Sequence, residues 1–330
     1  MKTRMTWQKI PPDKPSGSIK EEFRFDQESN EVSLNMREIE GLNVDHELHV
    51  VGSDILCIFL PSGRAPNAIS TYPRLGWKKR LSGLDILYLA DPYQNVEEFK
   101  AIGGSWFISR EGDSILPVFA DALNKFIAKS GYRRTILYGS SMGGYAAIIL
   151  GCWIDNSHAI AECPQLFLDK YPVSNGVITR FCTPEQREKL PNAVSILLEN
   201  ANSSRFTIAV NAFDQHHVNE HVFPLMNLLT SRESPVKSRI NFLFYINEVY
   251  PRGHTALMIE DAIHLIRQAQ DLEDISEAVQ LRSQLANVTS RLNEIESSRL
   301  MKFRHQIYRL TQTRLVQAAY RLFLKRKKRA

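Results

Sequence analysis

Residues 134–150 read RTILYGSSMGGYAAIIL and carry the strongest functional signal in the chain. The apolar run TILY predicts a short buried strand, and the residues from Met142 onward predict a helix. Between them a Gly-x-Ser-x-Gly pattern places Ser141 on a tight turn. Its glycines, Gly139 and Gly143, have no Cβ to block the close approach of strand and helix. This is the setting of a nucleophile elbow, in which we expect the Ser141 hydroxyl to point into open space.

The helix start behind this turn also suits an anion that forms near Ser141. The first N–H groups of a helix have no intrahelical acceptor and lie at the positive end of the helix dipole. We therefore expect the backbone N–H of Met142 to be one donor of an oxyanion hole. The alternative is an ordinary strand-to-helix turn, because a short pattern of this kind also arises by chance. An acid and then a histidine downstream would distinguish the two.

Composition narrows the class of protein. The chain has 330 residues, 43% of them hydrophobic, which is enough for one large core with or without an appendage and excludes disorder throughout. Four cysteines form no Cys-x-x-Cys pair, which favours a reducing compartment. The N-terminus lacks the apolar segment of a signal peptide, and no run approaches the length of a membrane span. We expect a cytoplasmic protein or one on the cytosolic face of a membrane.

The remaining apolar runs predict an α/β fold with a mostly parallel central sheet flanked by helices. The expected strands are Ile55–Leu60, Leu84–Ala90, His158–Cys163, Arg205–Val210 and Ile240–Ile246, with helices over Ser114–Ser130, His217–Leu229 and Ala256–Gln268. We predict an arm and early antiparallel strands in 1–50, a catalytic domain over 51–270 with a cap-like insertion at about 164–201, and a C-terminal extension over 271–330.

Two candidate catalytic residues follow predicted strands downstream of the elbow. Asp214 comes after the strand that ends at Val210, and His254 lies in the loop after the strand that ends at Ile246. Because the carboxyl ends of parallel strands meet at one edge of a sheet, we expect Ser141, Asp214 and His254 to gather there. Their order along the chain is nucleophile, acid, base.

These features together resemble the α/β-hydrolase family. The resemblance covers about residues 50–270 and is carried by the elbow Gly139-Ser-Ser-Met-Gly143, by Asp214 at its strand end and by His254 after a glycine. It implies that Ser141 attacks an acyl carbonyl, that His254 accepts and returns the proton, and that Asp214 orients and stabilises the imidazolium.

The resemblance also implies a second oxyanion donor and a class of substrate. The donor would come from the loop after the first central strand, where the backbone N–H of Gly63 or Arg64 is the candidate. The elbow, the Gly103–Phe107 loop and the Asp-x-x-His segment at Asp214 are similar to α/β-hydrolase proteins found with bacterial surface-polysaccharide machinery. This implies de-esterification or O-acylation of a glycan. No metal or other cofactor is implied, although acetyl-CoA would suit as acyl donor for a transferase.

Other interpretations of the same residues stay open. An Asp before a helix is also a good N-cap, and a histidine in a glycine-flanked loop can be simply solvated. Asp214, His217 and His221 have the spacing of metal ligands on one helix face, but a metal site leaves the elbow unexplained. A different class of function is a catalytically silent scaffold of the same fold that recruits partners at a membrane.

The C-terminal extension begins with a coiled-coil pattern. Apolar residues recur at alternating spacings of three and four, at Ala278, Leu281, Leu285, Val288, Leu292 and Ile295. This seam predicts a homo-oligomer formed through 278–295. Because it is shorter than three heptads, a helix that packs along its own chain is the alternative.

The last segment is strongly basic. Residues 301–330 contain ten Lys or Arg and no Asp or Glu, so the chain's net charge of +5 less these ten leaves residues 1–300 at −5. Apolar residues alternate with the charges, which predicts an amphipathic helix that binds an anionic membrane surface peripherally, on its inner face. Nucleic acid is not the expected partner, because residues 1–300 are acidic and the tail has no recognised nucleic-acid-binding fold. A solubilising tail is the remaining alternative.

Overall fold

The computed structural model describes most of the chain before residue 272. The described residues are 22–26, 31–35, 44, 46–64, 74–93, 96–247 and 253–271. The expectations for the N-terminal arm before residue 22, the coiled-coil seam at 278–295 and the basic segment at 301–330 lie outside the described residues.

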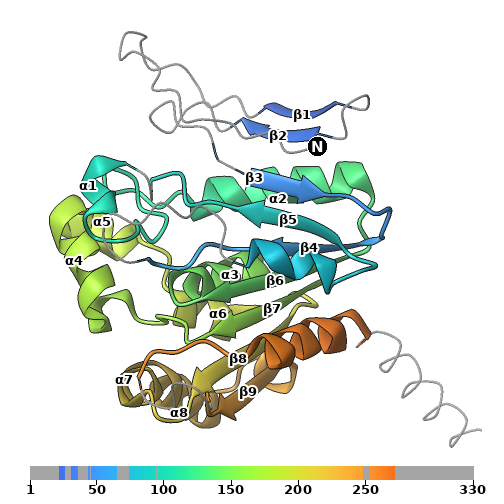
Figure 1. The fold of residues 1–330 in the computed structure, drawn as a ribbon. Coiled ribbons are helices and arrows are strands. Elements are labelled where there is room, and N and C mark those ends of the chain that lie inside the picture. The colour runs from blue at the N-terminus through green and yellow to red at the C-terminus, as the bar shows by residue number, and fades with distance from the viewer. Residues whose placement is uncertain are drawn as a thin grey trace, which may run out of the picture. The chain divides into compact units, whose positions relative to one another are not determined.

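A seven-stranded sheet forms the centre of the fold, in the order β3-β5-β4-β6-β7-β8-β9 (Figure 1). Its neighbouring strands are parallel except for the antiparallel pair β3 and β5. β1 and β2 pair antiparallel in a two-stranded sheet of their own. The strands are β1 (Glu22–Asp26), β2 (Glu31–Asn35), β3 (His46–His49), β4 (Ile55–Phe59), β5 (Asp85–Leu89), β6 (Arg134–Ser140), β7 (Ser157–Glu162), β8 (Arg205–Asn211) and β9 (Ile240–Tyr245).

Helices connect the parallel strands and cover both faces of the sheet (Figure 1). They are η1 (Leu75–Lys79), α1 (Glu97–Lys100), α2 (Leu116–Ser130), α3 (Met142–Trp153), η2 (Leu168–Lys170), α4 (Pro172–Phe181), α5 (Pro184–Lys189), α6 (Ala193–Glu199), α7 (Gln215–His217), η3 (Val218–Val222), α8 (Phe223–Ser231) and η4 (Lys237–Arg239). A further helix covers 259–271.

Each face of the sheet has its own hydrophobic core. In β4, Leu56 and Ile58 face a core that includes α2, α3, α6 and α8, whereas Ile55, Cys57 and Phe59 face a core built with the helix over 259–271. Successive strand residues point to opposite faces, so an unbroken apolar run is what a strand covered on both sides requires. This confirms the predicted parallel sheet with helices on both faces.

One predicted helix is irregular. The sequence predicts a single helix over His217–Leu229, but the structure has a π-helical turn, η3, between α7 and α8. Pro224 stands in the first turn of α8 and has no backbone N–H, so regular hydrogen bonding cannot continue across it. The insertion predicted at about 164–201 contains η2, α4, α5 and α6.

The topology brings distant segments to one edge of the sheet. β6, β7, β8 and β9 are successive parallel neighbours, so the segments that follow them leave the sheet on the same side. These segments carry Ser141, Gln165, Asp214 and His254.

Candidate active site

The elbow has the backbone that the glycine pattern predicts. Ser141 joins β6 to α3 with φ of 58°, a conformation that costs a non-glycine residue on the order of 1 kcal/mol or more. A Cβ on Gly139 would lie 2.0 Å from Gly143 O, and one on Gly143 would lie 2.6 Å from Pro61 O. The strained turn therefore depends on both glycines.

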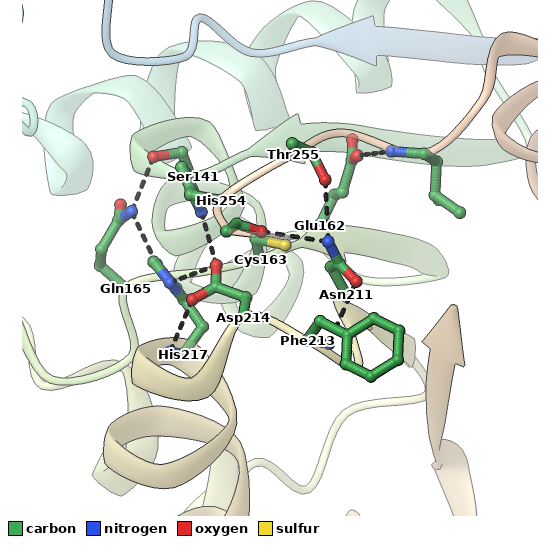
Figure 2. Close-up of polar contacts among 12 residues, drawn as sticks. Ser141, Glu162, Cys163, Gln165, Asn211, Phe213, Asp214, His217, His254 and Thr255 are labelled. Atoms are coloured by element: carbon green, nitrogen blue, oxygen red, sulfur yellow. Dashed lines mark hydrogen bonds and ion pairs between the residues drawn. The ribbon is translucent and has the colours of Figure 1, made fainter. Parts of the chain in front are cut away.

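The environment of the serine hydroxyl differs from the expectation. Ser141 does not point into open space: it is 8% exposed, and its Oγ accepts a hydrogen bond of 2.6 Å from Gln165 Nε2 (Figure 2). Gln165 is in turn held by Trp106, whose Nε1 donates to Gln165 Oε1 at 3.2 Å. The segment after β7 folds back over the elbow and covers the hydroxyl, which the sequence pattern of the elbow alone does not reveal.

Asp214 and His254 lie together as predicted. His254 Nδ1 is 3.1 Å from Asp214 Oδ2, although 40 residues separate them (Figure 2). Asp214 is 4% exposed, whereas the His254 side chain is 33% exposed. Ser141 and His254 make no hydrogen bond with each other in this structure, and Ser141 Oγ accepts from Gln165. Such contacts are often long in the absence of substrate and tighten when it binds.

A second histidine shares the same carboxylate. His217 Nδ1 lies 2.8 Å from Asp214 Oδ2, within ion-pair distance but without hydrogen-bond alignment, and its backbone N–H donates to Asp214 Oδ1 at 3.2 Å. The rings of His217 and His254 stack with centroids 4.3 Å apart. Because it accepts the hydrogen bond from the His217 backbone, Asp214 is also the N-cap of α7. The N-cap interpretation and the catalytic interpretation of Asp214 are therefore compatible.

Burial and hydrogen bonding act in opposite directions on the pKa of Asp214. Burial alone raises this pKa, but the interactions of Asp214 with His217 and His254 outweigh burial and hold the pKa well below its usual range. For His217 burial dominates: it lowers the pKa and favours the neutral ring, although Asp214 acts the other way. The site therefore keeps a charged carboxylate beside a neutral buried imidazole.

The candidate oxyanion donors are not equivalent. Met142 is the first residue of α3, so its N–H has no acceptor within the helix. The N–H of Arg64 donates to Gly103 O at 2.9 Å, which leaves Gly63 as the better of the two candidates from that loop. The contact is tight: a Cβ on Gly103 would lie 2.1 Å from Arg64 O. The role of each N–H stays a prediction.

Residues 253–258, which include His254, lie outside helices and strands and are held by polar side chains. Asn211 Nδ2 donates to Gly253 O at 3.0 Å and to Thr255 Oγ1 at 2.8 Å, and the Tyr245 hydroxyl donates to Thr255 O at 2.7 Å. The backbone N–H of Leu257 donates to Glu162 Oε1. The position of His254 is thus fixed from β7, β8 and β9.

Glu162 connects this loop to the elbow. Its backbone oxygen accepts from Ser141 N at 2.8 Å, while its fully buried carboxyl accepts from the Tyr138 hydroxyl at 2.7 Å and pairs with Arg74 at 3.1 Å. The Arg74 guanidinium lies 5.4 Å from the Trp77 ring centroid and 5.2 Å from that of Tyr138. A buried ion pair therefore supports the nucleophile and base segments together.

The sequence analysis missed Gln165, His217 as an Asp214 partner, and the pair Arg74 and Glu162. A glutamine in a loop has no motif, and Arg74 and Glu162 are 88 residues apart. For Glu162, the one signal available in the sequence was an acidic residue at the end of a predicted buried strand.

The structure groups other side chains than the three named in the metal alternative. Among the described residues, the three side chains whose ligand atoms lie within 4.8 Å of one another are Cys163, Asp214 and His254, not Asp214, His217 and His221. His221 Nδ1 accepts from the Phe167 N–H at 3.2 Å.

Comparison with solved structures identifies the fold as that of the α/β-hydrolases. The capsule O-acetyltransferase of Neisseria meningitidis serogroup A, in complex with caged gadolinium, aligns at a TM-score of 0.51 and 18% identity over 78% of this chain and 98% of that chain. A second structure of that enzyme gives a TM-score of 0.51 at 16% identity, over 74% and 96% of the two chains. An S-formylglutathione hydrolase from Agrobacterium tumefaciens aligns at 0.47 and 14% identity, over 71% and 91%. No protein-family model and no curated protein sequence matches the chain.

Proposed function

We propose that this protein is a serine enzyme that forms an acyl-Ser141 intermediate and passes the acyl group to water or to a hydroxyl. The observation that carries the proposal is the hydrogen bond between His254 and the buried Asp214, at the same sheet edge as the strained Ser141 turn. In this proposal Ser141 is the nucleophile, His254 the base and Asp214 the residue that orients the imidazole.

The chemistry follows from this arrangement. Ser141 Oγ attacks the acyl carbonyl and gives its proton to His254 Nε2, while Asp214 stabilises the imidazolium. The N–H groups of Met142 and Gly63 donate to the carbonyl oxygen as it becomes negative. The leaving group takes the proton from His254, and an acceptor hydroxyl or water then repeats the sequence in reverse.

A glycan hydroxyl or a glycan ester is the substrate class that we propose. Two features support it: the elbow and Gly103–Phe107 loop are similar to those of proteins associated with surface polysaccharides, and the fold is shared with a capsule O-acetyltransferase. If the reaction is transfer, a thioester such as acetyl-CoA is the proposed donor. Esterase and transferase chemistry use the same residues, so the acceptor decides between them.

The test is covalent labelling of the serine together with turnover of a small ester. A fluorophosphonate probe should label the wild-type protein at Ser141 and fail to label Ser141→Ala. Ser141→Ala, His254→Ala and Asp214→Asn should each lower kcat/KM by about a thousandfold or more, with Asp214→Asn the mildest. Ser140→Ala, at the neighbouring buried serine, is the matched control.

Two results would contradict the proposal. Near-normal ester turnover by Ser141→Ala would show that Ser141 is not the nucleophile. Absence of labelling in the folded wild-type protein would favour the silent scaffold, which keeps the fold without the reaction.

We further propose that residues 301–330 hold the protein at an anionic membrane surface and that 278–295 mediate self-association. Both proposals rest on sequence pattern alone. Within the part of the chain that the structure describes, every helix is too short or too polar to span a bilayer.

A further inference from the structure

Gln165 makes a hydrogen bond to the proposed nucleophile, and its amide can be oriented without ambiguity. The indole N–H of Trp106 is a donor only, so the atom that it meets at 3.2 Å must be the amide oxygen of Gln165. The amide nitrogen therefore faces Ser141 Oγ at 2.6 Å and His217 Nε2 at 3.2 Å (Figure 2).

The second contact of the amide nitrogen defines the tautomer of His217. An NH₂ group can only donate, so His217 Nε2 must be an unprotonated acceptor, and the ring proton lies on Nδ1, toward Asp214. Both amide hydrogens of Gln165 then have acceptors, one on the nucleophile and one on a ring paired with Asp214. Gln165 has no exposed surface, so water does not compete for either hydrogen bond.

The support for Gln165 is itself rigid. Trp106 is 2% exposed, and its backbone N–H contacts Met142 Sδ at 3.3 Å. Trp106 and Phe107 both have positive φ, 53° and 58°, in a loop whose Ser105 N–H donates to the buried carboxylate of Asp91 at 3.1 Å. Strained non-glycine residues of this kind persist where the surroundings fix them, commonly at functional sites. The donor that faces Ser141 is therefore preorganised.

We infer that Gln165 is a catalytic residue that stabilises Ser141 Oγ as the leaving group when the acyl-enzyme breaks down. The inference rests on the proposed acyl-Ser141 intermediate. In that step the acceptor oxygen bonds to the acyl carbon and its proton passes to His254. The bond from the acyl carbon to Ser141 Oγ then breaks, the electron pair goes to Oγ, and His254 returns the proton to Oγ.

The hydrogen bond from Gln165 affects the two half-reactions unequally. The resting hydroxyl already accepts this hydrogen bond, so acylation gains little from it. The ester oxygen of acyl-Ser141 is a weak acceptor, but Oγ becomes a strong one as charge builds on it during deacylation. Only interactions that are stronger in the transition state than in the preceding ground state accelerate a step. Gln165 should therefore speed deacylation more than acylation.

The experiment measures the two half-reactions separately, with p-nitrophenyl acetate as the acyl donor. Burst kinetics give the acylation and deacylation rates, and intact-protein mass spectrometry gives the fraction of acetylated Ser141. In Gln165→Met, which keeps the approximate volume and removes the donor, we expect deacylation to fall by about tenfold to a hundredfold. Acylation should change by only a few fold, so the acetyl-enzyme accumulates.

Two further variants keep the outcome interpretable. Trp106→Phe removes the indole N–H that orients the amide, and should give a smaller shift in the same direction. Gln186→Ala, in the exposed capping box of α5, is the matched control and should leave both rates unchanged. Circular dichroism and thermal unfolding report whether each variant is folded.

The possible failures are distinguishable. If wild-type protein shows no acetyl-Ser141 under single-turnover conditions, the proposed function fails. If wild-type protein forms acetyl-Ser141 but folded Gln165→Met and Trp106→Phe slow both half-reactions equally, or slow neither, then Gln165 is only structural and the inference is overturned.

Discussion

Asp214 illustrates, at the scale of single residues, which parts of the site a sequence can predict. Its position after a strand and its order relative to Ser141 and His254 are properties of the chain, and the structure brings Asp214 and His254 together. The contact of Gln165 with Ser141 depends on how a loop folds back over the elbow, which no local pattern encodes, whereas His217 lies three residues from Asp214 and its spacing was visible in the sequence. Sequence therefore predicted the residues with a motif and missed those with only a tertiary position.

The buried histidine His158 leads to a prediction about the stability of the protein at acid pH. Burial lowers the pKa of His158 to about 4, with Arg205 and Arg134 acting in the same direction, and its Nδ1 has no hydrogen-bond partner in the described structure. Between pH 6.5 and 4 the unfolded state binds a proton at this ring that the folded state does not, so the free energy of unfolding falls as pH falls through this window. One such ring contributes about 2 kcal/mol between pH 7 and pH 5.

The variant His158→Gln, which keeps a neutral partner for Thr207 at this position, should remove that contribution. Urea unfolding at pH 7 and pH 5 measures it as a smaller loss of stability in the variant than in the wild type. His264→Gln, at an exposed ring, is the control and should preserve the wild-type pH dependence. An unchanged pH dependence in His158→Gln would show that His158 is not the group that titrates.

At the scale of elements, β7 forms part of the sheet and also connects the elbow to the loop that carries His254. Its last residue, Glu162, binds the elbow through its backbone and the His254 loop through its side chain, with Arg74 as the compensating charge. The strand itself was predictable from its apolar run. The pairing of Glu162 with Arg74 was not, because buried ion pairs between distant segments leave no periodic signal in the sequence.

Breaking this ion pair should damage both stability and turnover. Glu162→Gln and Arg74→Met should each lower the free energy of unfolding by about 3 to 5 kcal/mol, because each leaves a buried charge without its partner. The double variant should lose less than the sum of the two. Because Glu162→Gln leaves one acceptor oxygen where the carboxylate had two, the anchoring of the His254 loop should weaken and kcat should fall more than KM rises.

Urea unfolding of the four proteins and steady-state kinetics on a small ester provide the measurements. Asp121→Asn, which removes an exposed i,i+4 pair with Lys125 on α2, is the control and should cost less than about 1 kcal/mol. Strict additivity of Glu162→Gln and Arg74→Met would mean that the pair is not coupled.

At the scale of the whole molecule, the predicted strands succeeded because their burial is extreme. β4, β5 and β6 are buried at every position, so continuous apolar runs were sufficient to identify them. The antiparallel β3 is half-buried throughout, so its sequence shows a weaker strand pattern.

The charge of the chain is divided unevenly: residues 301–330 carry ten positive charges, whereas residues 1–300 have a net charge of −5.

This charge division predicts that the last segment controls location without affecting chemistry. Deleting 301–330 should abolish binding to vesicles that contain anionic lipid and leave small-ester turnover unchanged, because the proposed catalytic residues all lie before residue 255. Binding of the full chain should weaken as the salt concentration rises, since salt screens exposed charges.

The double substitution Phe303→Asp with Leu310→Asp should reproduce part of the loss of vesicle binding, because carboxylates enter the lipid boundary only at high cost in free energy. Co-sedimentation with anionic and with neutral vesicles measures each effect, and equal pelleting of the full and truncated chains would exclude the membrane role.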